Sequence, residues 1–203
     1  ELSVLGLVVN VDPVLSLGDT VVDNDNDDDP PTFSSTGDFR YVFRDTRMVN
    51  DDYRYSNAAD SGANARWTLT VDTPGTLVEI AATWAGGTNR ATNAPYRVWD
   101  ATGTTLLAGP FYVDQNPNPN DFEDFGIMWE RVGTVLLDPG VDTFIVELGT
   151  DGINGYVHAD AVWAGRSTTP ELVVEEGGTT LSDEVSTVDF GYSELFPTTP
   201  KTR

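Results

Sequence analysis

Asp151-Gly-Ile-Asn-Gly-Tyr-Val-His-Ala-Asp-Ala-Val-Trp-Ala-Gly165 is the stretch of the chain that most directly indicates its fold. It opens on two dipeptides, Asp151-Gly152 and Asn154-Gly155, which tolerate positive φ and suit tight turns. Residues 142–148 precede these turns and residues 156–163 follow them. The sequence therefore predicts a β-hairpin with these two runs as its strands.

Alternation within residues 156–163 predicts one strand with two distinct faces. One face would carry Val157, Ala159, Ala161 and Trp163, and the other Tyr156, His158, Asp160 and Val162. We expect one of these faces to lie in a hydrophobic core.

Two further runs alternate in the same way. Residues 65–71 place Trp67, Leu69 and Val71 on one face. Residues 77–84 place an apolar set on the inward face, namely Val78, Ile80, Ala82 and Trp84. Turn signals stand at residues 72–75, 101–103 and 138–140, and no helical period is sustained. This pattern predicts an all-β protein, a β-sandwich of jelly-roll type, with Trp67, Trp84 and Trp163 in its core.

The chain divides by composition into three parts. Residues 1–22 begin with an apolar run that suits a buried strand, residues 23–166 hold the predicted sandwich, and residues 167–203 form a C-terminal strand extension. Residues 50–64 are polar and rich in turn formers.

The charge balance excludes two classes of partner. The 203 residues include 11 basic and 33 acidic side chains, for a net charge of −22. Nucleic acid and anionic lipid both need a basic surface, so neither is expected, and no apolar run is long enough to insert into a membrane. The chain has no cysteine, begins at Glu1 and shows no signal peptide. We expect a processed, secreted chain, which the absence of cysteine does not exclude; a sequence cut out of a longer one would look the same.

A series of motifs resembles a known family. The motifs are Val22-Asp-Asn24, Phe33-Ser-Ser-Thr-Gly-Asp-Phe39, Ile80-Ala-Ala-Thr-Trp84, Asn89-Arg-Ala-Thr-Asn-Ala-Pro-Tyr-Arg-Val-Trp99, Val113-Asp-Gln115, Trp129-Glu-Arg-Val-Gly133 and Asn154-Gly-Tyr-Val-His-Ala-Asp-Ala-Val162. Together they resemble the golvesin-type domain, which is also described as similar to the carbohydrate-binding domain of xanthan lyase. The resemblance covers residues 22–165 and implies a non-catalytic β-sandwich module of secreted bacterial proteins, with a role in sugar binding.

The tail resembles a different family. Residues 170–191 are similar to the opening strands of immunoglobulin-like repeats of the choice-of-anchor, or Hydin, type. An incomplete domain of this kind exposes unpaired strand edges, which recruit another strand. We therefore expect a non-enzymatic structural subunit that pairs residues 170–196 with a neighbouring copy, head to tail, and so forms a fibre. The residues expected to make this contact are Leu2, Val4, Leu172, Val174, Val188 and Phe190. The alternative is that the tail folds back on its own domain.

The second functional hypothesis is a carbohydrate-binding module of a larger secreted enzyme or adhesin. Trp99 and Trp129 are the candidates for stacking on sugar rings, beside Tyr96, Tyr112 and the loop of residues 116–125. The alternative for each is that it packs in the interior.

Alternating carboxylates at Asp23, Asp25 and Asp27 suggest a Ca²⁺ site, because hard oxygen ligands on alternate residues can converge on one cation. The spacing departs from an EF-hand loop, and a solvated acidic turn is the alternative. No other cofactor is expected.

Catalytic groups are not evident. The single histidine, His158, lies two residues from Asp160, but no Gly-x-Ser-x-Gly motif accompanies them. We expect a hydrogen-bonded strand histidine. Glu123, Asp124 and Glu130 are the best placed carboxylates for glycoside hydrolysis, in a chain where acidic residues are frequent. The sequence therefore predicts no enzyme.

Overall fold

A computed structural model describes residues 19–25, 32–43, 45–72, 75–166, 174–176 and 179–181 of the chain. Contacts divide the chain into two units, residues 12–168 and a unit made of residues 1–11 and 169–203. The described part of the first unit contains one short 3-10 turn, η1 (Val49–Asp51), and thirteen strands. The strands are β1 (Thr20–Val22), β2 (Phe33–Thr36), β3 (Arg40–Phe43), β4 (Asp52–Asn57), β5 (Asn64–Thr70), β6 (Leu77–Ala82), β7 (Ala94–Asp100), β8 (Leu106–Val113), β9 (Phe122–Asp124), β10 (Ile127–Leu136), β11 (Thr143–Gly149), β12 (Tyr156–Ala159) and β13 (Val162–Arg166). No helix among the described residues is long and apolar enough to cross a membrane.

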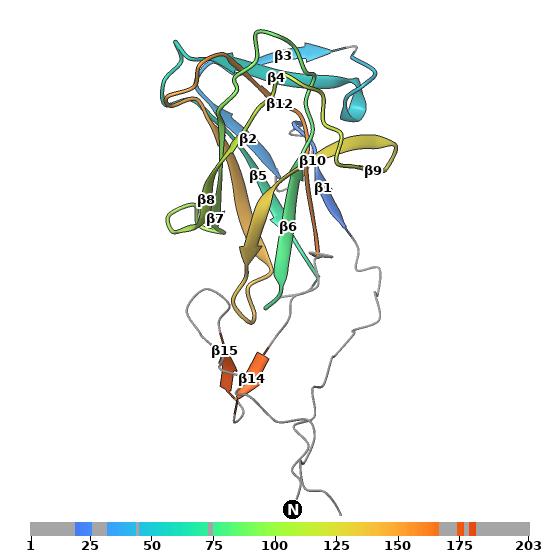
Figure 1. The fold of residues 1–203 in the computed structure, drawn as a ribbon. Coiled ribbons are helices and arrows are strands. Elements are labelled where there is room, and N and C mark those ends of the chain that lie inside the picture. The colour runs from blue at the N-terminus through green and yellow to red at the C-terminus, as the bar shows by residue number, and fades with distance from the viewer. Residues whose placement is uncertain are drawn as a thin grey trace, which may run out of the picture. The chain divides into compact units, whose positions relative to one another are not determined.

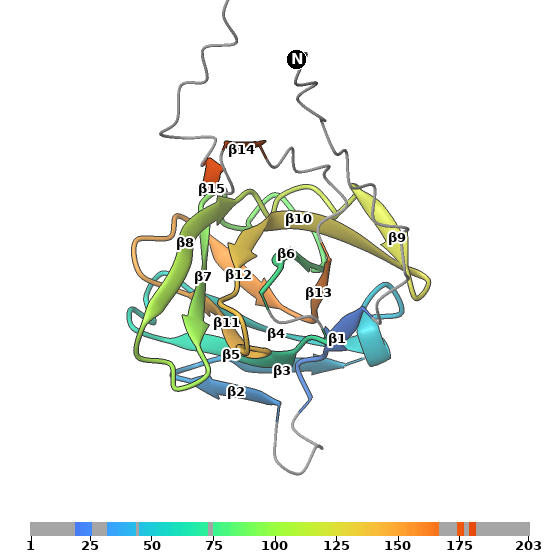
Figure 2. The ribbon, with the colours of Figure 1, turned by 90° about the horizontal axis from the view of Figure 1, so that it is seen from below.

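Two five-stranded antiparallel sheets form the body of the first unit. Their strand orders are β1-β13-β6-β10-β9 and β2-β5-β11-β7-β8. Figure 2 shows β7, β11 and β5 on one side and β10, β6 and β13 on the other. The interior between them is filled by fully buried apolar side chains that include Trp67, Leu69, Ile80, Val135 and Phe144. Burying each such side chain stabilises the fold by about 1.5–3 kcal/mol. The prediction of an all-β sandwich is confirmed.

The two sheets meet at both of their long edges. At one seam, the Thr20 hydroxyl of β1 donates a 2.7 Å hydrogen bond to the Thr70 carbonyl of β5. At the other seam, the ring of Phe111 in β8 lies against Gly133 in β10, where a Cβ atom would come within 2.7 Å of the ring. The close approach therefore requires glycine, and the register of β10 shifts at this position.

A third sheet, with strand order β12-β4-β3, lies across one end of the sandwich (Figure 1). Its strand β4 occupies part of residues 50–64, which the sequence indicated only as polar and rich in turns. Tyrosines alternate there with polar side chains, and two of those polar side chains, Asp52 and Ser56, are buried. A strand whose inward face is polar does not produce the alternation of apolar and polar residues on which sequence reasoning depends.

The hairpin predicted at residues 142–163 is wrong. Strand β11 pairs with both β5 and β7, so neither of its edges is open to the following strand. The chain instead crosses to the third sheet, where β12 pairs with β4. It then leaves that sheet at Asp160 and Ala161 and joins the first five-stranded sheet as β13.

The single alternation predicted for residues 156–163 is interrupted at the same crossing. Val157 and Ala159 point into the main core, as does Val162, whereas Ala161 and Trp163 belong to a second buried cluster. The run predicted as one strand is therefore two strands in two sheets. The odd-numbered residues face the main core in β12, whereas the even-numbered residues face it in β13.

In residues 65–71 and 77–84 the side chains predicted to face the core do so. Trp67, Leu69 and Val71 lie in the main core, as do the four apolar residues expected to point inward from residues 77–84. The opposite side of β6 is also covered, because Ala81 packs with Trp129, Ala161 and Trp163. The hairpin of β9 and β10 covers this outer cluster, with the rings of Phe122 and Trp163 at 5.1 Å. Trp67, Trp84 and Trp163 are all buried, as predicted.

Little of the two terminal segments is described. Within residues 174–176 and 179–181, strand β14 (Val174–Glu176) pairs antiparallel with β15 (Thr179–Leu181). The other residues of the predicted self-association contact lie outside the described residues, namely Leu2, Val4, Leu172, Val188 and Phe190. At the other boundary, residues 20–22 form β1 inside the sandwich, whereas the composition of the chain predicts that they precede it.

Candidate binding site

The exposed face of the third sheet gathers aromatic and basic side chains. Tyr53 and Tyr55 share one side of β4 because they are two residues apart. Antiparallel register sets Arg40 of β3 and His158 of β12 on either side of Tyr55. Val42 lies opposite Tyr53 in the same register. Side chains from three strands therefore converge on one surface.

A groove of about 390 Å³ lies on this surface. The loop between β6 and β7 forms one of its walls. The groove is lined by Arg40, Val42, Tyr53, Tyr55, Asn89, Arg90, Tyr156 and His158. Every one of these residues is neutral or basic, although the chain as a whole is strongly acidic.

Ring contacts order the floor of the groove. The Tyr53 ring stacks on the His158 imidazole with centroids 4.4 Å apart and planes inclined by 20°. The Tyr55 ring meets the edge of Tyr156 at 5.9 Å. Tyr156 is 37% exposed, so its ring is available to a ligand from solvent. Such contacts hold the tyrosines in place before any ligand arrives.

The backbone of His158 is fixed by one buried side chain. The His158 N–H donates to Gln115 Oε1 at 2.8 Å, and the Gln115 amide donates back to the His158 carbonyl at 3.0 Å. The same amide donates to the Tyr96 hydroxyl at 3.1 Å. Gln115 thus takes the place of a neighbouring strand along the free edge of β12.

His158 is neutral at physiological pH. Burial lowers the pKa of its imidazole to about 3, and the positive charge of Arg90 acts in the same direction. Its Nδ1 has no hydrogen-bond partner among the residues that the structure describes. Asp160 does not orient the ring, because its carboxylate accepts hydrogen bonds from the Val49 N–H and from Asn24. His158 and Asp160 are only two residues apart in the sequence, but the chain crosses from β12 to β13 between them. The two side chains therefore do not form a catalytic pair.

The backbone of Arg90 is held against β12. The Tyr156 N–H donates to the Asn89 carbonyl at 3.0 Å, and the Ala91 N–H donates to the Tyr156 carbonyl at 2.7 Å. This approach needs Gly155, where a Cβ atom would stand 2.6 Å from the Arg90 carbonyl carbon. The Arg90 guanidinium donates to the Ala85 carbonyl at 3.0 Å and to the Asn89 side chain.

The predicted sugar-binding residues do not come together. Trp129 and Tyr96 are 0% and 1% exposed, so neither can stack on a ligand from solvent, and the expectation that they belong to a surface site is wrong. The outer face of the first sheet, where Trp129 lies, is covered by the β9–β10 hairpin. Trp99 is half-buried in β7, and Tyr112 in β8 is 66% exposed. A role for Trp99 and Tyr112 stays a prediction.

The groove tyrosines were not anticipated from sequence. Tyr53 and Tyr55 stand two residues apart in a segment that the sequence indicates only as polar and rich in turn formers, and this spacing is the signal that places them on one side of a strand. Arg90 and Tyr156 lie inside family-like motifs, yet nothing in their spacing shows that they meet.

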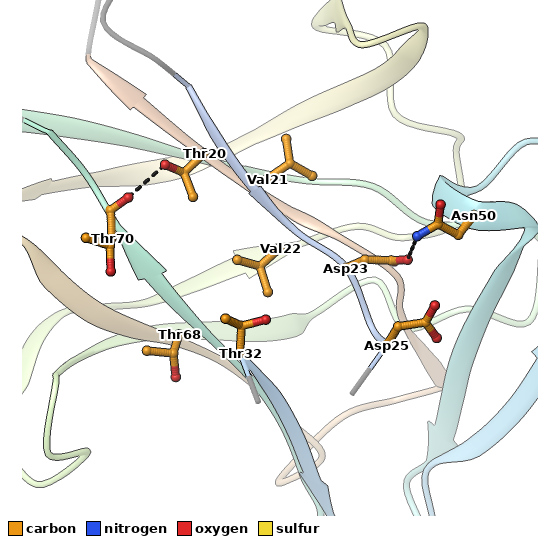
Figure 3. A pocket seen from close by; sticks show the side chains of 9 residues that line it. All are labelled: Thr20, Val21, Val22, Asp23, Asp25, Thr32, Asn50, Thr68 and Thr70. Atoms are coloured by element: carbon orange, nitrogen blue, oxygen red, sulfur yellow. Dashed lines mark hydrogen bonds between the residues drawn. The ribbon is translucent and has the colours of Figure 1, made fainter. Parts of the chain in front are cut away.

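The predicted calcium ligands lie at a different cavity. Asp23 and Asp25 line a pocket of about 470 Å³ beside β1 and β5 (Figure 3). The Asp23 carboxylate accepts a 2.6 Å hydrogen bond from Asn50, and burial raises its pKa to about 6. Asp27 lies outside the described residues, and within those residues no group of three His, Cys, Asp or Glu side chains is arranged to hold a metal ion. The Ca²⁺ site stays a prediction.

The family model described as the Golvesin C-terminal domain matches residues 20–166. The chain belongs to this family. The match covers every strand of the sandwich and the whole groove, so the candidate site lies within the golvesin domain. The golvesin assignment made from sequence motifs is confirmed, whereas the resemblance of the tail to a Hydin-type repeat stays a prediction.

Solved structures resemble the golvesin domain. Paenibacillus xanthan lyase aligns with a TM-score of 0.56 and 28% sequence identity, over 73% of this chain and 13% of the lyase chain. The catalytic unit of an α-1,3-glucanase from Streptomyces thermodiastaticus aligns with a TM-score of 0.42 and 14% identity, over 81% of this chain and 28% of the glucanase. The chain thus spans a small part of either enzyme. No curated protein matches it.

Proposed function

We propose that the golvesin domain is a non-catalytic module that binds polysaccharide in the groove formed by β3, β4 and β12. The observation that carries this proposal is the set of three tyrosines, Tyr53, Tyr55 and Tyr156, which line one groove and contact its other rings. Sugar rings present flat faces of C–H groups bordered by hydroxyls. A tyrosine ring packs against such a face while its hydroxyl, or a neighbouring polar group, takes the hydrogen bonds.

Polar groups of two kinds accompany the tyrosines. The Asn89 amide and the Arg90 guanidinium stand beside the groove and can donate hydrogen bonds to sugar hydroxyls. The similarity to part of xanthan lyase also supports a polysaccharide ligand, because the name of that enzyme identifies a polysaccharide, xanthan, as its substrate. We propose, for the same reason, that the protein binds its polysaccharide outside the cell.

We propose binding without cleavage. Most glycoside hydrolases act through a pair of carboxylates that flank the scissile bond. The described lining of the groove contains neither Asp nor Glu. Asp124 and Glu130, two carboxylates considered from the sequence, serve structural hydrogen bonds with Trp163 and with the backbone of Asn120.

Binding to a panel of soluble polysaccharides, measured by affinity electrophoresis and titration calorimetry, tests the function. Tyr53→Ala, Tyr55→Ala and Tyr156→Ala should each weaken binding by about 2 kcal/mol, or about thirtyfold in Kd, because truncating an aromatic anchor at a binding surface costs this much.

Tyr112→Ala is the matched comparison and tests the alternative site, since Tyr112 is an exposed tyrosine on β8 of another sheet and a candidate for sugar binding from the sequence. If the groove is the site, the affinity of Tyr112→Ala should equal that of the wild type. Binding lost in Tyr112→Ala and kept in the groove variants would move the site to β8. Absence of binding to every polysaccharide would refute the proposed function.

Head-to-tail self-association by strand exchange was the first hypothesis drawn from the sequence, and it stays a prediction. Of its six contact residues only Val174 falls in a described strand, where it pairs with Leu181 of the same chain. The proposed function, polysaccharide binding in the groove, does not depend on self-association.

A further inference from the structure

The charged groups of the groove suggest which polysaccharides it takes, and this inference rests on the proposed function. The chain has 33 acidic and 11 basic residues, so carboxylates are available to pair with nearly every arginine. Five arginines accordingly form ion pairs with Asp or Glu in the described residues: Arg40, Arg47, Arg66, Arg97 and Arg131. Arg90 forms none there, although it lies on the wall of the groove.

The Arg90 guanidinium forms no ion pair in the described part of the protein, where the charges of Asp45 and Arg47 act on it in opposite directions. The Arg90 guanidinium donates to two neutral oxygens, the Ala85 carbonyl and the Asn89 side chain. The side chain is half-buried, and burial lowers the pKa of the guanidinium, which nevertheless stays charged at every physiological pH. A partly desolvated cation whose hydrogen-bond partners are neutral is unfavourable, and an anion brought into contact by a ligand would relieve that cost.

The surroundings of Arg90 favour a sugar carboxylate as that anion. A guanidinium binds a carboxylate through two parallel hydrogen bonds, and such charge-assisted bonds are stronger than those to hydroxyls. Tyr53 and Tyr156 line the same groove, so a sugar ring stacked there would carry its substituents past Arg90. His158 is neutral and adds no competing charge.

We infer that the groove selects polysaccharides whose sugars carry carboxylate groups, with the Arg90 guanidinium as the group that recognises the carboxylate. Arg40, on the far strand of the sheet, pairs with the exposed Asp38 and adds a second cation at the groove. The chain's net charge of −22 does not exclude an acidic ligand. Salt screens the repulsion between exposed charges beyond about 8 Å at physiological ionic strength, whereas contact within a groove is screened far less.

The test compares one oligosaccharide in two forms. Oligouronates, and the same oligosaccharides after chemical reduction of each carboxyl to a primary alcohol, differ only in the group that Arg90 would bind. Calorimetric titration of the full chain at 150 mM salt should show at least tenfold tighter binding of the carboxylated form.

Arg90→Gln keeps a hydrogen-bond donor and removes the charge. It should lower affinity for the carboxylated form tenfold or more and leave affinity for the reduced form within a factor of two. Arg97→Gln, which removes the same charge from a residue outside the groove, should leave both affinities unchanged. Arg90→Lys keeps the positive charge and should retain part of the preference.

Equal binding of the two forms by the wild-type chain would overturn the inference and leave the proposed function standing. An equal loss for both forms in Arg90→Gln would overturn it as well. Absence of binding to either form, together with absence of binding to neutral polysaccharides, would refute the proposed function itself. The wild-type comparison decides the question even if Arg90→Gln does not fold.

Discussion

His158 shows how burial sets the chemistry of a single residue. Its side chain is 2% exposed, and its imidazole has a pKa of about 3 in the fold against about 6.5 in an unfolded chain. The folded state therefore binds the proton more weakly than the unfolded state. The stability contributed by the neutral ring is present above pH 6.5 and is lost as the pH falls toward 3.

His158→Gln should consequently be less sensitive to acid than the wild type. Between pH 7.5 and 4.5 the wild-type protein should lose about 3 kcal/mol more of its free energy of unfolding than the variant, measured by urea denaturation. Asp23 and Asp160 oppose this trend in both proteins, because burial raises their pKa values and their contribution is lost as the pH rises. The difference between the two proteins isolates His158. Parallel pH profiles would show that the histidine is not held neutral by the fold.

Trp129 illustrates how a side chain on the outer face of a sheet can still be buried. It was expected at the surface, yet it is fully buried and its indole N–H donates to the Asp124 carbonyl at 3.0 Å. The reason is the short β9 strand, which folds back along β10 and covers that face. Its residues had been assigned to a loop.

Strand β12 and the loop that carries Arg90 form the element on which the site depends. Two backbone hydrogen bonds join them, from the Tyr156 N–H to the Asn89 carbonyl and from the Ala91 N–H to the Tyr156 carbonyl, and hold the arginine beside the tyrosines. Gly155 makes this approach possible, because any side chain there would overlap the Arg90 backbone. The geometry of the groove therefore depends on a residue that is not among those lining it.

Gly155→Ala should push the Arg90 loop away from β12. We expect a loss of about 1–3 kcal/mol in unfolding free energy, together with weaker polysaccharide binding in the folded protein, because the new methyl group meets backbone atoms rather than a flexible side chain. Gly149→Ala is the matched control, since its methyl group would meet mainly the mobile end of Arg97. Unchanged stability and binding in Gly155→Ala would contradict the close packing of the two segments.

For the whole molecule, the open question is whether the sandwich acts alone. The unit of residues 12–168 has its own core and contains the complete groove. Binding of polysaccharide belongs to this unit, whereas assembly was predicted from the terminal segments. The two properties can therefore be separated by truncation.

Deleting residues 167–203 should leave a folded protein that binds polysaccharide as the full chain does, because the sandwich keeps its entire core. If the C-terminal segment pairs with a neighbouring copy, the full chain should be larger than a monomer by light scattering and the truncated chain should be monomeric. A full chain that is monomeric throughout, or an assembly that survives the deletion, would refute strand exchange.

Local patterns in the sequence determined several of the strands and their faces, β5 and β6 among them. In β5 and β6 the alternation of large apolar and polar residues places Trp67 and Ile80 in the core, because a strand repeats every two residues whatever its partner. Turn-forming residues marked the β7–β8 connection, where Gly103 has a φ of 69°. Family-like motifs located the golvesin domain. These features depend on neighbours in the chain and are therefore readable from it.

Pairing and the site were decided only by the tertiary structure. Strand β11 has β5 on one edge and β7 on the other, and its own sequence does not specify which strands lie beside it. This pairing sends β12 to the third sheet, which sets Tyr156 beside Tyr55 and Arg90, residues distant from it in the chain. The groove exists because three strands and one loop meet there, and no local pattern encodes such a meeting.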